Sequence, residues 1–347
     1  MGFSPISISG KTVYIHSAVS APDFGAAKVL SDDPWDYVAL WLRRAGNDEA
    51  RFYWEQSREF YKASIELSPI SSPLTSYYCF LNAAKSLLTQ KQVSFSDKHG
   101  VTGFTKPGKK CLTNEVVRLQ GSGVLYSLCC CLGESIRPNE TYSLNEIFYH
   151  LPFLHRAFTL TYKSKIELFL PIKQPMFVRK DGSDDAWFVA ELDARYVSSQ
   201  LKNILPSSYE VDEGIKNRCL IRRKKRFKWK TRGNHQANNL TNLVSYHKEV
   251  RRDITPIFAP VNSWYIQKKL KTVTSIAKSQ LPLVFVAMHK LSELSRYDPI
   301  TLARHLDLQH NWILTEFLQV APAQFINHIA CEITGKEFVK PYAARLS

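Results

Sequence analysis

Residues 166–170 read Ile-Glu-Leu-Phe-Leu, and this stretch marks a change in the periodicity of the chain. Ile166, Leu168 and Leu170 alternate at period two, which is typical of a strand with one buried face. The same pattern recurs, with turn residues between the runs, at 187–192, 219–229, 243–250 and 263–267. We therefore predict a mainly antiparallel sheet of about five or six strands over residues 161–270.

Toward the N-terminus the apolar residues recur at helical spacing instead. Asp33-Pro34 predicts one helix start, Asn47 a second and Ser72-Pro73 a third. Downstream of these, we predict a loop at 91–113, a short strand at 115–120, a helix at 121–133 and a short helix opened by Ser143. Residues 1–32 are predicted to be an irregular or strand-containing lead-in.

Helical periodicity returns after Pro282, Asp298-Pro299 opens a further helix, and residues 310–334 indicate one or two more. We therefore predict the α+β class, with a helical body formed by the N- and C-terminal parts and a central β region. The helical regions are 33–160 and 281–347, and the second packs on the first. Residues 161–280 form a basic, β-rich insertion.

Charge is concentrated in that insertion. The chain has 347 residues and a formal net charge of +15, and residues 161–280 hold 24 Lys and Arg against 11 Asp and Glu. A basic surface of this kind indicates a polyanionic partner. No apolar run reaches the roughly 20 residues that cross a bilayer, so we expect no membrane partner. The seven cysteines lack the spacing of a disulfide framework or zinc site, which favours a cytoplasmic protein.

The strongest candidate for binding nucleic acid is residues 216–232, here called the basic segment, which has ten basic residues among seventeen and no acid. The predicted phosphate-contacting residues are Arg218, Arg222, Arg223, Lys224, Lys225, Arg226, Lys228, Trp229, Lys230 and Arg232. Phe227 and Trp229 could stack on bases. They share one face of the predicted strand, so the alternative is that both belong to the core. A solvated edge strand is the alternative for the whole segment. If the sheet brings them together, the patch also includes Arg179-Lys180, Arg251-Arg252 and Lys268-Lys269.

The helical parts resemble the YaaC-like protein family. The resemblance covers about half of the chain and is weak over 161–280. The residues that carry it are 52–64, 76–85, 99–100, 123–128 and 291–299. It implies an all-helical frame and no established chemistry. The long helices are also similar, more loosely, to HEPN-type domains, many of which cut RNA in antiviral and toxin systems.

Arg304 and His310 resemble the Arg-x(4–6)-His motif of HEPN ribonucleases. The resemblance implies a catalytic pair in which the Arg stabilises phosphate charge and the His transfers a proton at the RNA 2′-hydroxyl. Ordinary residues on a helix surface are the alternative.

Four further residues, Lys85, His99, Arg296 and Tyr297, are candidates for one pocket of the helical body. The alternative for Arg296 is a buried side chain that closes a helix end.

The chain contains no phosphate-binding glycine loop, nucleophile elbow, zinc-protease motif or dinucleotide fingerprint, so we expect no metal or cofactor. The leading hypothesis is a non-enzymatic or weakly enzymatic protein that binds DNA or RNA, with antiphage defence as the predicted setting. The second is a HEPN-like, metal-independent RNA endonuclease. The third is a scaffold subunit that holds an acidic protein partner in a complex, and oligomerisation stays open.

Overall fold

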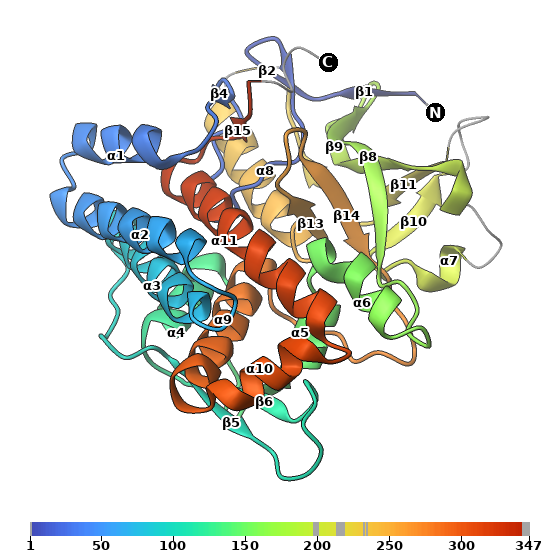
Figure 1. Ribbon diagram of the computed structural model, residues 1–347. Coiled ribbons are helices and arrows are strands. Elements are labelled where there is room, and N and C mark those ends of the chain that lie inside the picture. Colours follow the sequence, from blue (N-terminus) through green and yellow to red (C-terminus); the bar gives the residue numbers. More distant parts are fainter. Residues whose placement is uncertain (1, 197–200, 213–218, 232, 234, 342–347) are drawn as a thin grey trace.

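The computed structural model describes residues 2–196, 201–212, 219–231, 233 and 235–341. Most helices gather on one side of the molecule and a large sheet lies on the other, as Figure 1 shows. Each side has a hydrophobic core of its own: one is built from the helices, and the other from the sheet and the helix that packs on it. The predicted α+β class is confirmed.

The helical body contains a helical framework and a small antiparallel sheet. Its helices are α1 (Trp35–Arg44), α2 (Asp48–Glu66), α3 (Ser72–Gln90), α4 (Val124–Leu132), α5 (Leu144–Tyr149), α6 (His155–Thr161), α9 (Gln280–Tyr297), α10 (Pro299–Asp307) and α11 (Asn311–Thr334). Its strands are β5 (Val101–Thr105), β6 (Glu115–Leu119) and β7 (Thr141–Ser143). Three of the predicted helix starts carry side-chain caps, because Asn47 accepts from the backbone of Ala50, Ser143 from that of Glu146 and Asp298 from that of Thr301.

The large sheet has eight described strands, and every neighbouring pair is antiparallel. They are β1 (Phe3–Pro5), β8 (Phe169–Lys180), β9 (Asp185–Leu192), β10 (Tyr209–Asp212), β11 (Cys219–Arg223), β12 (Phe227–Lys228), β13 (Ile254–Ile257) and β14 (Ser263–Gln267). The order is β10-β11-β9-β8-β14-β13, with β1 on β8 and β12 on β9. Smaller elements are β2 (Ser7–Ile8), β3 (Lys11–Thr12), β4 (Val29–Leu30), β15 (Phe338–Val339), η1 (Pro152–Leu154), η2 (Ala194–Tyr196) and α7 (Leu201–Ile204).

Three local predictions differ from the structure. Residues 243–250 are the second half of α8 (Gln236–Val250) and not a strand, because Leu243, Tyr246 and Val250 are buried at spacings of three and four on one helix face. Strand β5 lies in the predicted loop 91–113 and pairs with β6. Ile166 and Leu168, predicted to alternate within a strand, precede β8, which begins at Phe169. The N-terminal lead-in contains strands, as predicted, and contributes β1 to the large sheet through pairing with β8.

The two bodies meet where the ends of α8 and α11 approach the N-terminal segment. Glu332 of α11 is fully buried and accepts hydrogen bonds from the backbone of Val19 and Ser20. Arg251, directly after α8, donates to the carbonyl oxygens of Ser17 and Ile254. These bonds fix the end of the sheet-covering helix against the helical body. None of the described helices is long and apolar enough to span a bilayer.

Candidate functional site: a basic cleft between the two bodies

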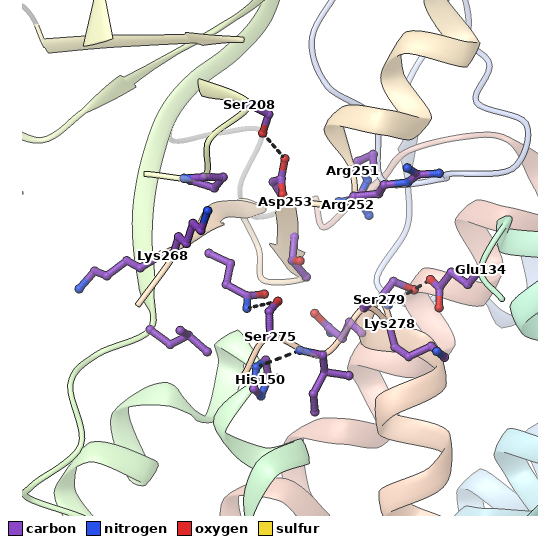
Figure 2. A pocket seen from close by; sticks show the side chains of 18 of the residues that line it. Glu134, His150, Ser208, Arg251, Arg252, Asp253, Lys268, Ser275, Lys278 and Ser279 are labelled. Carbon is purple, nitrogen blue, oxygen red and sulfur yellow. Dashed lines mark hydrogen bonds between the residues drawn. The ribbon is translucent and has the colours of Figure 1, made fainter. Parts of the chain in front are cut away.

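A cleft of about 570 Å³ lies between the helical body and the large sheet. We call it the interbody cleft. Its walls come from the end of α4, the end of α8, the strand edge at 252–255 and the segment 267–280 that leads into α9. Ligand sites occur preferentially at such boundaries between bodies. Figure 2 shows this cleft with Lys268 on one side and Glu134 on the other.

Positive charge dominates the lining. Among the described residues, six basic side chains and two acidic ones line the cleft; the basic ones are Lys248, Arg251, Arg252, Lys268, Lys269 and Lys278, and the acidic ones are Glu134 and Asp253. A concave surface with an excess of one charge sign concentrates ligands of the opposite sign. The chemistry that this lining favours is therefore recognition of an anion.

Two of the six cations have structural partners. Arg251 is buried, donates to two carbonyl oxygens and lies 5.0 Å from the ring centre of Trp264. Burial lowers its pKa to about 10, against the opposing charges of Glu332 and Glu337. Lys278 contacts Glu140 at 2.7 Å, and its side chain is 2% exposed. Neither cation is available to a ligand.

The other four, Lys248, Arg252, Lys268 and Lys269, form no ion pair or side-chain hydrogen bond with any residue that the structure describes. Lys248 packs over Gly133, where an added Cβ would lie 2.4 Å from its Cε. Burial lowers the pKa of Lys268, against an opposing effect of Glu167. These four unpaired cations, called the cleft cations below, are the groups that can meet a ligand anion.

Fixed hydrogen bonds hold the polar floor of the cleft. Ser208 donates to Asp253 at 3.0 Å, and the Ile276 backbone N–H donates to Nε2 of His150 at 3.4 Å. Nδ1 of His150 contacts the Glu146 carbonyl, so Nδ1 carries the proton and Nε2 accepts. Burial lowers the pKa of His150 and raises that of Glu134. Burial therefore disfavours the charged form of each group.

Most described cations of the basic segment are already paired within the protein. Arg222 contacts Glu210 at 2.7 Å and Asp212 at 3.1 Å. The remaining ion pairs are Arg223 and Lys225 with Glu249, and Lys228 with Asp185. Arg226 lies 4.2 Å from the ring centre of Trp187. Lys224 and Lys230 are exposed, whereas Arg218 and Arg232 lie outside the described residues.

The two aromatic residues of the basic segment belong to the core of the sheet. Phe227 and Trp229 are each 9% exposed, and both pack in the cluster that α8 covers. We expect Trp229→Ala to lower the free energy of unfolding by about 2–4 kcal/mol, because it opens a cavity in that core. Urea denaturation measures this, with Trp229→Phe as the milder control. Unchanged stability combined with lost nucleic-acid binding would instead identify Trp229 as a stacking face.

A smaller polar hollow of about 260 Å³ lies where β12 meets the start of α8. It is lined by Lys228, Lys230, His235, Asn238, Asn239, Thr241 and Asn242. Asn239 bonds to both backbone polar groups of Lys230, which ties the basic segment to the helix. The two ends of α8 thus lie beside two hollows with basic residues.

Arg304 and His310 occupy different environments. Arg304 is exposed on α10, whereas His310 is 3% exposed at the start of α11 and its ring lies 5.5 Å from that of His305. Burial, with the charges of His305 and Lys109, lowers the pKa of His310 to about 4. The described interactions include none between Arg304 and His310, so the catalytic pair stays a prediction without a contact to support it.

The four candidates in the helical body are partly brought together. The charges of Lys85 and Arg296 both act on His99, where they lower its pKa in addition to burial. Tyr297 is 75% exposed, and the guanidinium of Arg296 lies 4.7 Å from its ring centre. Arg296 itself is exposed, so it is not the buried helix-closing arginine of the alternative interpretation.

Sequence reasoning included Arg252, Lys268 and Lys269 only as an extension of the basic segment, and it did not single out Lys248. The sequence did contain a signal for Lys248, since it lies in the last turn of α8 and one turn before Arg251-Arg252 once 243–250 is recognised as helical. Among the described residues, no group of three or more His, Cys, Asp or Glu side chains is placed to hold a metal ion.

Comparison with known proteins gives one match. The family model described as YaaC-like Protein matches residues 15–333, which includes both bodies and the interbody cleft. No curated protein and no solved structure matches the chain.

Proposed function

This chain belongs to the YaaC-like protein family, and from that premise and the geometry of the interbody cleft we propose that it binds nucleic acid through backbone phosphates. The observation that supports the proposal is the set of four cleft cations without a carboxylate partner. Arg252 and Lys269 are exposed and Lys248 and Lys268 are half-buried, so all four can meet a ligand that supplies the opposite charge. Phosphodiesters supply it in a repeating array and release condensed counterions on binding.

The cleft cations replace the basic segment as the main phosphate contacts in this proposal. Five cations of that segment already have a carboxylate or an indole ring beside them, so a phosphate would have to compete for each of them. Lys224 and Lys230 remain exposed and extend the positive surface. A nucleic-acid strand that runs along α8 from the interbody cleft to the smaller polar hollow would span about 22 Å, the length of this helix.

The proposed setting is the cytosol, where free cysteines persist, and a role in antiphage defence remains part of the proposal. Nothing in the geometry of the cleft requires bond cleavage. The proposed activity is binding, with catalysis left to a partner protein if the complex has one.

Equilibrium binding of labelled single- and double-stranded RNA and DNA over a salt series tests the proposal. We expect the logarithm of the association constant to fall linearly with the logarithm of salt concentration, with a slope of about −3 for four phosphate contacts. Polyglutamate serves as an acidic polypeptide competitor. Binding of polyglutamate without binding of any nucleic acid would overturn the proposal in favour of an acidic protein partner.

A further inference from the structure

The two sides of the interbody cleft differ in chemistry. Six branched aliphatic side chains of the described lining belong to the core of the helical body or pack against it; they are Val19, Leu132, Leu168, Leu270, Val273 and Ile276. Three of the cleft cations, Arg252, Lys268 and Lys269, instead follow α8 and β14, which belong to the core of the large sheet. The cleft therefore has an apolar wall on the helical body and a basic wall on the sheet.

The segment from Ser275 to Ser279 joins these two walls across the floor of the cleft. Nε2 of Gln267, the last residue of β14, donates to the Ser275 hydroxyl at 3.3 Å. Four residues later, the Ser279 backbone N–H donates to Glu134 of the helical body at 3.0 Å. In Figure 2, Ser275 lies between Lys268 and Ser279. Four residues span at most about 14 Å, so a ligand of the size of one nucleotide can contact both walls.

Gln280, the first residue of α9, brings a buried amide to the cleft. Its side chain lines the cleft and is only 4% exposed, and its Oε1 has no hydrogen-bond partner among the described residues. Buried polar atoms are rarely left in this state, because such an atom gives up its water and gains no bond in return. A primary amide offers an acceptor and two donors on one edge. A ligand with a donor beside an acceptor would satisfy it.

A single nucleotide has the same division of chemistry, since its base has two apolar faces and a polar edge while its phosphate is anionic. We propose that the interbody cleft holds one unpaired adenine nucleotide, with the base between the apolar wall and the Gln280 amide and the phosphate on Arg252, Lys268 and Lys269. This inference rests on the proposed function, whose cations hold the phosphate. The nucleotide belongs to a single strand or is free in solution. A base within a duplex is stacked and paired, so it does not reach the wall.

Adenine is the base that fits the amide best. It presents an amino donor beside a ring acceptor on two edges, N6 with N1 and N6 with N7, whereas a pyrimidine presents a donor–acceptor pair on one edge only. Glutamine therefore pairs with adenine through two hydrogen bonds, while guanine is recognised mainly by Arg or Lys. A purine also covers more of the apolar wall than a pyrimidine does. Gln280 is thus the residue that selects the base.

Equilibrium binding of labelled oligoadenylate and oligouridylate of equal length tests the inference. We expect the intact protein to bind oligoadenylate about 10-fold more tightly, since a bidentate contact between an amide and adenine discriminates by roughly this factor. Both strands carry the same number of phosphates, so the cations cannot produce the difference. Adenosine monophosphate is a third ligand, which reports binding of the nucleotide without a strand.

Gln280→Leu should reduce the preference for oligoadenylate to less than about 2-fold, because it removes the amide and keeps the bulk of the side chain. The salt slope should not change, since no cation is lost. Gln280→Met has the unbranched shape of glutamine and should give the same result if leucine disturbs the packing. Gln120→Leu is the control, because Gln120 lies outside the cleft and bonds to Thr102, and it should keep the full preference. The annealed duplex should bind equally to the intact protein and to Gln280→Leu.

The outcomes separate this inference from the proposed function. Equal binding of the two strands, or an adenine preference that both Gln280 variants keep, would overturn the base site while the proposed function stands. Binding of adenosine monophosphate without binding of either strand would support the nucleotide site and overturn the proposed function. If none of the three ligands binds, both are wrong.

Discussion

Glu115→Ala is expected to lower the free energy of unfolding by about 3–5 kcal/mol, because it leaves a buried lysine without its partner. Glu115 is fully buried on β6, and Lys290 of α9, with a side chain 4% exposed, contacts it at 3.2 Å. Nε2 of His305, on α10, contacts the other carboxylate oxygen at 3.3 Å. This network joins three elements of the helical body, so the loss extends beyond one contact.

The pH dependence of that loss has a definite sign. Burial alone would raise the pKa of Glu115, but hydrogen bonds from His305 and Thr105 and the charge of Lys290 lower it overall. A carboxyl whose pKa is lower in the folded protein contributes stability above its unfolded pKa and loses it as pH falls through the folded value. The difference between the wild type and Glu115→Ala should therefore shrink below about pH 4.5.

Denaturant unfolding at several pH values measures both effects. Asp36→Ala is the matched control, because it removes an exposed carboxylate from Arg58 and should cost less than about 1 kcal/mol. The double variant Glu115→Met/Lys290→Met removes both charges and should recover much of the loss. If Glu115→Ala proves as mild as Asp36→Ala, the buried network does not support the helical body in the way described.

Replacing three cleft cations together, Arg252→Ala/Lys268→Ala/Lys269→Ala, is expected to weaken nucleic-acid binding on the order of 100-fold, since each charge-assisted contact contributes about 1 kcal/mol or more. The salt slope should become shallower by about two to three, or just under one per lost phosphate contact. Because none of the three side chains forms an ion pair or side-chain hydrogen bond with a described residue, and only the charges of Glu167 and Asp253 act on Lys268 and Arg252, the variant should keep most of its stability.

A second triple variant of equal charge is the control. Arg222→Ala/Lys225→Ala/Lys228→Ala removes three cations that contact Glu210, Glu249 and Asp185. Each loss frees a carboxylate as well, and a phosphate would have to displace that carboxylate from the cation, so the salt slope should change by less than it does in the cleft variant. If this variant loses binding and the cleft variant keeps it, the phosphates lie on the basic segment.

The helical frame could be predicted from local signals. Asn47 and Asp298 cap helices where the sequence places caps, and Leu170 of the period-two stretch lies in β8 of the central sheet. The second half of α8 was predicted wrongly because Val244, Tyr246 and Val250 are separated by even numbers of residues, which also fits one face of a strand. Only packing against the sheet shows that Leu243, Tyr246 and Val250 form the buried face.

The interbody cleft was not predictable in the same way. Its cations come from three parts of the chain, and their meeting depends on how α8, β13 and the segment after β14 pack against the end of α4. Charge density along the sequence pointed instead to residues 216–232. The density of charge along the sequence does not show which cations form ion pairs. Arg222, Lys225 and Lys228 pair with Glu210, Glu249 and Asp185, which are all distant in sequence.

The measurement that tests the central claim most directly is photochemical crosslinking of a bound oligonucleotide, with the crosslinked peptides identified by mass spectrometry. The interbody cleft predicts crosslinks at the end of α8 and in residues 252–255 and 267–280, which fade in the Arg252→Ala/Lys268→Ala/Lys269→Ala variant. Crosslinks confined to surfaces outside the cleft, and unchanged in that variant, would contradict the account.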